Sequence, residues 1–133
     1  MAVEIVIDTN RYRDFVEGEV GTVSIFRSAP KIHVPLVVVA ELRAGFAVGS
    51  RGAENQRAFE KFIHRPRLEV MTPTMDTTRH YAHLYRQLRS SGTPIPTNDL
   101  WIAALVVQHD IPLYSRDAHF DLIPQLPRIG RGE

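Results

Sequence analysis

Cysteine is absent from this 133-residue sequence. The chain therefore has no disulfide, no thiol nucleophile and no cysteine-ligated zinc or iron–sulfur site, and any metal must use oxygen or imidazole ligands. No apolar run approaches the roughly 18 residues of a membrane span, and Glu4 stands where a signal peptide carries basic residues. We expect a soluble, cytoplasmic protein without membrane association.

Lysine is nearly absent too, because Lys31 and Lys61 are the only two among 16 basic residues and the others are arginine. Arginine presents a planar fork suited to phosphate oxygens. The formal net charge is only +1, however, so total charge does not indicate a nucleic-acid-binding protein. A genome rich in arginine codons is the simpler explanation of the excess.

Motifs of several enzyme classes are also missing. The sequence has no Gly-x-Ser-x-Gly, no Gly-x-Gly-x-x-Gly and no Gly-Lys-Ser/Thr, which argues against serine hydrolases, dinucleotide-binding proteins and P-loop enzymes. His80 and His83 lie three residues apart on a predicted helix. Because no further ligand stands at a matching spacing, we expect a solvated helix face there and not a zinc site.

The residues that are present predict one α/β domain over 1–133. A composition of 44% hydrophobic and 23% charged residues is ordinary for a globular protein of this length. Short apolar runs predict strands at 2–7, 32–34, 68–71 and 113–115, and helical patterns fall at 11–17, 20–27, 35–45, 53–64, 74–90 and from 97 onward. This alternation predicts a mainly parallel sheet between helical layers.

Four carboxylates stand out against this framework. Ligands of such folds bind beyond the carboxyl ends of the strands, and Asp8 and Asp117 follow two of the predicted strands. Asp99 opens the most apolar helix, and Glu41 lies inside another apolar helix, where an uncompensated charge costs several kcal/mol. These four side chains are expected at one edge of the sheet.

Each carboxylate also has an ordinary explanation. The aspartates could form turns or cap a helix, and Glu41 could pair with Arg43 or Arg116. Together, however, four converging acids need a compensating cation, and hard oxygen ligands favour Mg²⁺ or Mn²⁺. Such an ion activates water and neutralises charge on a reacting phosphate. The combination indicates phosphodiester hydrolysis.

Four segments in this order resemble the PIN-domain ribonucleases, in particular the VapC toxins of type II toxin–antitoxin systems. The segments are Ile7-Asp8-Thr9-Asn10, Val39-Ala40-Glu41-Leu42-Arg43-Ala44-Gly45, Asn98-Asp99-Leu100-Trp101-Ile102-Ala103-Ala104 and Leu113-Tyr114-Ser115-Arg116-Asp117-Ala118-His119-Phe120-Asp121-Leu122-Ile123-Pro124. The resemblance implies a three-layer α/β/α sandwich and a metal-dependent endoribonuclease. Its catalytic and metal-binding acids would be Asp8, Glu41, Asp99 and Asp117.

The same resemblance implies supporting groups and partners. Thr9, Asn10 and Ser115 would supply hydrogen bonds around the acids. Members of the family usually dimerise, cut structured RNA such as tRNA or an rRNA loop, and are blocked by a cognate antitoxin that inserts a segment into the active-site groove. Contact with operator DNA would occur only through that antitoxin.

The last segment departs from the commonest family pattern, in which an acid often precedes the phenylalanine. This chain has His119 at that position, so Asp117 is expected as the fourth carboxylate, with Asp121 as a substitute. Ser115 stands where threonine is frequent, and a hydroxyl is kept.

Other side chains near these segments have two interpretations. Arginines beside the motif acids could hold RNA phosphates or could be solvated surface charges; they are Arg11, Arg13, Arg43 and Arg116. Aromatic residues at helical spacing are expected to pack in the core and not to stack on bases; they are Phe59, Phe62, Tyr85 and Trp101.

Two rival functions remain open at this point. One is a non-catalytic PIN-like binding subunit of a DNA-binding repressor complex, and the other is a metal phosphatase acting on small phosphoesters.

Overall fold

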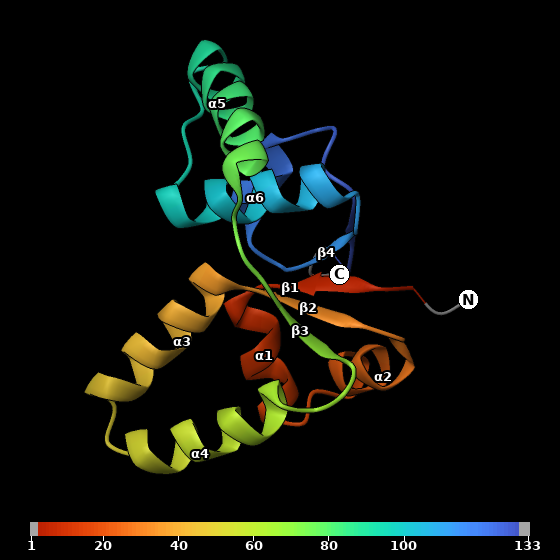
Figure 1. Ribbon diagram of the computed structural model, residues 1–133, viewed down its shortest axis with the longest axis vertical. Coiled ribbons are helices and arrows are strands. Elements are labelled where there is room, and N and C mark those ends of the chain that lie inside the picture. The colour runs from red at the N-terminus through yellow and green to blue at the C-terminus, as the bar shows by residue number, and fades with distance from the viewer. Residues whose placement is uncertain (1–2, 131–133) are drawn as a thin grey trace.

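Five short parallel strands form the centre of the molecule in the computed structural model, which describes residues 3–130 (Figure 1). The strands are β1 (Ile5–Ile7), β2 (Ile32–Pro35), β3 (Leu68–Met71), β4 (Leu113–Tyr114) and β5 (Arg128–Ile129). Their order is β3-β2-β1-β4-β5, and each neighbouring pair is parallel. In the middle strand, Val6 is in register with His33 on one side and Leu113 on the other.

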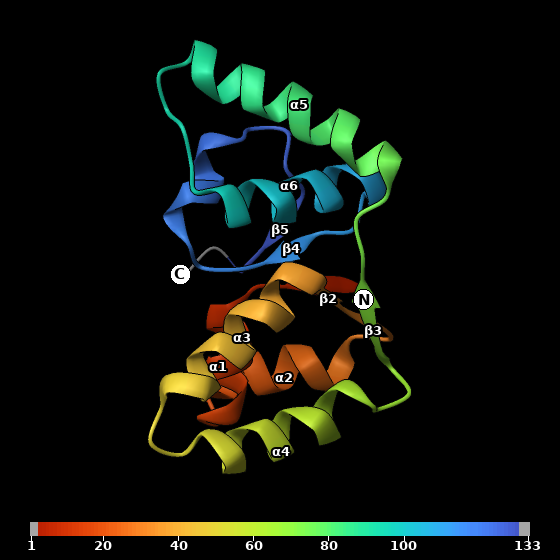
Figure 2. The ribbon, with the colours of Figure 1, turned by 60° about the vertical axis from the view of Figure 1, so that its left-hand side comes forward.

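Helices cover both faces of this sheet (Figures 1 and 2). One side carries α1 (Thr9–Val16), α2 (Val20–Ser28), α3 (Leu36–Val48) and α4 (Gly52–Ile63). The other side carries α5 (Met75–Ser90), α6 (Thr97–His109) and the short 3₁₀ helix η1 (Ala118–Leu122). The expected three-layer α/β/α sandwich is confirmed. Among the described residues, no helix has the length and apolar character needed to cross a membrane.

The central elements are apolar because they are covered from two sides. Ile5, Val6 and Ile7 of β1 have no exposed surface, as expected for a parallel strand between helical layers. Helix α6 packs against α5, and its run from Ile102 to Val106 is also fully buried. These two elements therefore fix the positions of the residues that follow β1 and begin α6.

Two of the aromatic predictions are confirmed and one is wrong. Phe59 and Phe62 of α4 are buried and pack edge-on against Tyr12 of α1. Tyr85 is 49% exposed, so it is not a core residue. Its helical spacing places it on the edge of the α5 face that contacts α6. Trp101 is half-buried beside Tyr81, with ring centroids 4.5 Å apart.

The predicted strands and helices are all present, with shifted ends. Pro35 is the last residue of β2 and precedes α3, which continues to Val48, beyond the expected end at residue 45. Neither β5 nor η1 was expected from the sequence. Both are very short, and β5 is held mainly by its pairing with β4, where Leu113 is in register with Arg128.

Candidate active site

Asp8 is the most deeply buried acid at the carboxyl end of the sheet. It follows β1 and caps α1, accepting a hydrogen bond from the Thr9 amide at 2.7 Å, and it is only 5% exposed. Its second oxygen accepts from the Ser115 hydroxyl at 2.9 Å. Burial raises the pKa of Asp8 to about 6, and the nearby charges of Asp99 and Glu41 act in the same direction. Both close hydrogen-bond donors are neutral.

Ser115 joins the two strands that end here. It follows β4, is fully buried, and accepts hydrogen bonds from Asn10 Nδ2 at 3.2 Å and from the Asp117 amide at 3.1 Å while it donates to Asp8. Parallel pairing of β1 with β4 places these residues at one edge. The hydroxyl therefore sets the position of the Asp8 carboxylate.

Asp99 and Asp117 lie together around His119. Nδ1 of His119 is 2.8 Å from Asp99 Oδ2 and 3.1 Å from Asp117 Oδ1. The pKa of Asp99 is raised, mainly by burial, although the hydrogen bond to His119 opposes this shift. The hydrogen bond to Asp99 in turn raises the pKa of His119. Asp99 is the third residue of α6, whose N-cap is Pro96, so it is not the N-cap of that helix.

Glu41 is half-buried on α3 and accepts a hydrogen bond from Thr9 Oγ1 at 3.1 Å. The arginine pairs considered for it are not formed. Arg43 pairs with Glu60 at 2.8 Å, and Arg116 pairs with Asp14 at 2.9 Å. An ion pair with either arginine is therefore excluded as the explanation of Glu41.

Asp121 is separate from this group. Its carboxylate is half-exposed and pairs with Arg128. Asp117, in contrast, shares the imidazole of His119 with Asp99 and is the N-cap residue of η1. The geometry thus favours Asp117 over Asp121 as the fourth acid.

The arginines beside the motifs have different surroundings. Arg11 is only 6% exposed; its guanidinium lies 4.1 Å from the centre of the Tyr114 ring and donates to Asp14 and to the Gly130 carbonyl. Burial removes Arg11 from the arginines expected to contact RNA phosphates. Arg13 is exposed and reaches Gly45 of α3.

The residues at this edge suit a divalent cation. Asp99, Asp117 and His119 each offer a ligand atom, and these atoms all lie within 4.8 Å of one another. Buried Asp8 supplies a further carboxylate whose close hydrogen-bond partners carry no positive charge. Mg²⁺ and Mn²⁺ prefer such oxygen-rich sites. On α5, His83 is exposed and His80 lies 3.8 Å from Asp76, as expected for a solvated helix face.

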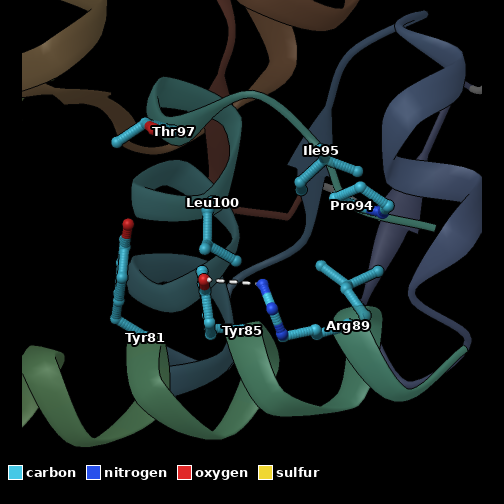
Figure 3. A pocket seen from close by; sticks show the side chains of 8 residues that line it. Tyr81, Tyr85, Arg89, Pro94, Ile95, Thr97 and Leu100 are labelled. Carbon is cyan, nitrogen blue, oxygen red and sulfur yellow. Dashed lines mark hydrogen bonds between the residues drawn. The ribbon is translucent and has the colours of Figure 1, made fainter. Parts of the chain in front are cut away.

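A small cavity of about 130 Å³ lies beside this site, between α5 and α6 (Figure 3). Thr97 and Leu100, on either side of Asp99 in sequence, form part of its wall, and Arg89 donates to the Tyr85 hydroxyl at 3.4 Å. The full lining is Tyr81, Tyr85, Leu88, Arg89, Pro94, Ile95, Thr97 and Leu100. It contains no carboxylate, so the acidic edge and this cavity are distinct features.

Comparison with known proteins shows the family. The model of the PIN domain matches residues 5–126, and the chain belongs to the PIN domain family. Ribonuclease VapC4 of Mycobacterium tuberculosis is 28% identical over 96 residues, which cover 72% of this chain and 74% of the relative. Ribonuclease VapC1 of Haemophilus influenzae strain R2866 is 31% identical over 94 residues, covering 65% and 68%.

Solved structures of VapBC complexes share the fold. VapBC2 from Rickettsia felis, bound to a DNA fragment from its promoter, contains a chain that matches with a TM-score of 0.86 and 23% identity, covering 95% of this chain and 97% of that one. VapBC-1 from Haemophilus influenzae matches with a TM-score of 0.83 and 22% identity, covering 98% and 99%. At these identities the likeness establishes the architecture alone.

Proposed function

We propose that this chain is a VapC-type ribonuclease, the toxin of a type II toxin–antitoxin system, and that it cuts RNA with Mg²⁺ or Mn²⁺. The observation that carries this proposal is the convergence of Asp8, Asp99, Asp117 and Glu41 at one edge of the sheet. Asp8 is buried there without a cationic hydrogen-bond partner, and the only one near Asp99 is the half-exposed His119. The ribonuclease names of the VapC relatives agree with it.

The four carboxylates hold the cation, and their neighbours fix their orientations. Ser115 and the Thr9 amide orient Asp8, while the Thr9 hydroxyl orients Glu41. Asn10 holds Ser115 in turn. The bound cation lowers the pKa of a water and neutralises charge on the phosphate. Hydrolysis is expected to leave a 5′-phosphate and a 3′-hydroxyl.

The proposed substrate is structured RNA such as tRNA or an rRNA loop, met in the cytoplasm. Exposed Arg13 is placed to contact a backbone phosphate near α3; Arg43 and Arg116 would do so only if they also kept, or gave up, their ion pairs with Glu60 and Asp14. Such contacts supply affinity and salt dependence and do not select a sequence.

The proposed partners are a cognate antitoxin and a second copy of the chain, with operator DNA contacted only through the antitoxin. The structural relatives crystallised as VapBC complexes, one of them on promoter DNA.

The test is cleavage of total cellular RNA by the purified chain, free of antitoxin, with Mg²⁺, with Mn²⁺ or with EDTA. Discrete fragments that require the metal and disappear in Asp8→Asn are expected. Folded protein that binds a partner tightly but cuts no RNA would contradict the proposal and favour the non-catalytic binding subunit. Hydrolysis of a chromogenic phosphomonoester at a rate comparable with RNA would favour a phosphatase.

A further inference from the structure

We propose that His119 is a direct metal ligand and that its imidazole makes the site prefer Mn²⁺ to Mg²⁺. This inference rests on the proposed function, because it concerns the same cation site. His119 stands where the related sequences often carry an acid, so the consequence is particular to this chain.

The imidazole already points at the two acids. Nδ1 lies 2.8 Å from Asp99 Oδ2 and 3.1 Å from Asp117 Oδ1. The three ligand atoms are within 4.8 Å of one another, close to the distance of about 4 Å across an octahedral Mg²⁺ or Mn²⁺ shell. A small contraction of the group therefore brings all three atoms onto one ion.

The chain holds His119 in this position from both sides. Its backbone amide donates to Asp117 Oδ1 at 2.9 Å, which fixes the first turn of η1. The next residue, Phe120, has no exposed surface and anchors η1 in the core beside α6. The side chain of His119 itself is 47% exposed. The ring thus spans the edge of the site, with the acids on one side and solvent on the other.

A nitrogen ligand changes which cation is favoured. Mg²⁺ prefers an all-oxygen shell and keeps several of its waters. Imidazole binds transition metals well, and Mn²⁺ accepts mixed nitrogen and oxygen ligands more readily than Mg²⁺ does. Exchange of an acid for His119 therefore lowers the negative charge offered to Mg²⁺ while it keeps a good ligand for Mn²⁺.

A second interpretation is that His119 only forms an ion pair with the two acids and leaves when a metal binds. Pulsed electron paramagnetic resonance of bound Mn²⁺ separates the two, because a coordinated imidazole produces a coupling to ¹⁴N. The experiment titrates Mn²⁺ and Mg²⁺ alone, without RNA, into the wild type, His119→Gln, His119→Asp and the control His83→Gln on exposed α5.

The wild type and His83→Gln are expected to show the nitrogen coupling, and His119→Gln to lose it. Mn²⁺ affinity should fall at least about 10-fold in His119→Gln, the lower end of the loss seen when supporting groups of a metal site are removed. His119→Asp should retain metal binding and shift the preference toward Mg²⁺. Absence of the coupling in the wild type, or unchanged Mn²⁺ affinity in His119→Gln, overturns the inference.

Failure of this inference is distinguishable from failure of the proposed function. If His119→Gln binds Mn²⁺ like the wild type while Asp8→Asn does not and the wild type cuts RNA, only the role of His119 is wrong. If the folded wild type binds neither cation and cuts no RNA, the proposed function fails, and the role of His119 fails with it.

Discussion

Asp8 and Asp14 are two buried aspartates at opposite ends of α1, and their surroundings are opposite in charge. Asp14 is 8% exposed and accepts hydrogen bonds from the guanidinium groups of Arg116 and Arg11, which lower its pKa, Arg116 most of all. Asp8 is 5% exposed and its close hydrogen-bond donors are uncharged, so burial raises its pKa to about 6. One helix therefore carries a compensated acid and an uncompensated one.

This difference separates a structural carboxylate from a candidate functional one. The charge of Asp14 is offset within the chain, and its ion pairs connect α1 to the segment after β4. The charge of Asp8 is left for something outside the chain to offset, and the same holds in part for Asp99. Burial alone does not identify a functional acid, whereas burial without a cationic partner does so more specifically.

The largest expected effect is on catalysis. Asp8→Asn removes a charged ligand while it keeps the size of the side chain, so metal-dependent RNA cleavage should fall at least about 100-fold, since even supporting groups of metal sites cost up to that much. Circular dichroism should show an unchanged fold. Asp14→Asn is the matched control, and its folded fraction should cut RNA at nearly the wild-type rate. Equal activity of Asp8→Asn and the wild type would contradict this assignment.

The second expected effect is a pH-dependent change in the stability of the metal-free protein. The pKa of Asp8 lies near 6 in the folded state and near its ordinary value of 3.8 in the unfolded chain, so between these values the folded state binds the extra proton. The contribution of Asp8 to stability is therefore lost as pH rises from about 4 to about 6.

Asp8→Asn lacks this loss. Its free energy of unfolding in EDTA should exceed that of the wild type by an amount that grows over this pH range, to roughly 3 kcal/mol at most. Urea denaturation of both proteins from pH 4.5 to 7.5 measures the difference. A difference that stays constant with pH would show that Asp8 is not strained by its ionisation.

Asp14→Asn should have the opposite sign. Loss of the charged hydrogen bonds to Arg116 and Arg11 should lower the free energy of unfolding at pH 7 by about 2 kcal/mol, reduced by the screening of half-exposed Arg116. Urea denaturation checks this value. Asp121→Asn, which breaks a half-exposed ion pair with Arg128, is the control and should cost about 1 kcal/mol or less. Similar losses in both variants would mean that Asp14 is no more important to the fold than a surface acid.

The smallest expected effect comes from the residue that orients Asp8. Ser115→Ala removes the hydroxyl that donates to Asp8 and accepts from Asn10 and the Asp117 amide. Cleavage should fall about 10-fold, and Ser115→Thr, which keeps a hydroxyl, should recover most of this loss. Single-turnover cleavage rates at saturating Mn²⁺ measure both variants. A full rate in Ser115→Ala would remove this residue from the site.

Local sequence patterns were enough to predict the strands and the acids at their ends. The apolar run before Asp8 and the one before Ser115 each end in polar residues, and parallel pairing of β1 with β4 brings those ends together. The position of Asp99 followed from the apolar helix that it opens. These features depend on periodicity and on one topological rule, so no tertiary contact had to be known.

Contacts between distant residues could not be predicted in this way. Arg116 and Asp14 are 102 residues apart, and no local pattern marks them as partners. For the same reason Arg11 was expected at a phosphate although it is buried against Tyr114. His119 was visible in the sequence as a departure from the family pattern. Its proximity to Asp99, 20 residues away, required the structure.

The central claim is that Asp8 waits for an external cation, and thermal unfolding with and without Mn²⁺ at pH 7.5 tests it most directly. In EDTA, Asp8→Asn should melt at a higher temperature than the wild type. Saturating Mn²⁺ should then stabilise the wild type by an amount set by ligand concentration over Kd, about 2.7 kcal/mol at 100 times Kd, and should leave Asp8→Asn nearly unchanged. Equal stabilisation of both proteins by Mn²⁺, with Asp8→Asn no more stable in EDTA, would contradict the claim.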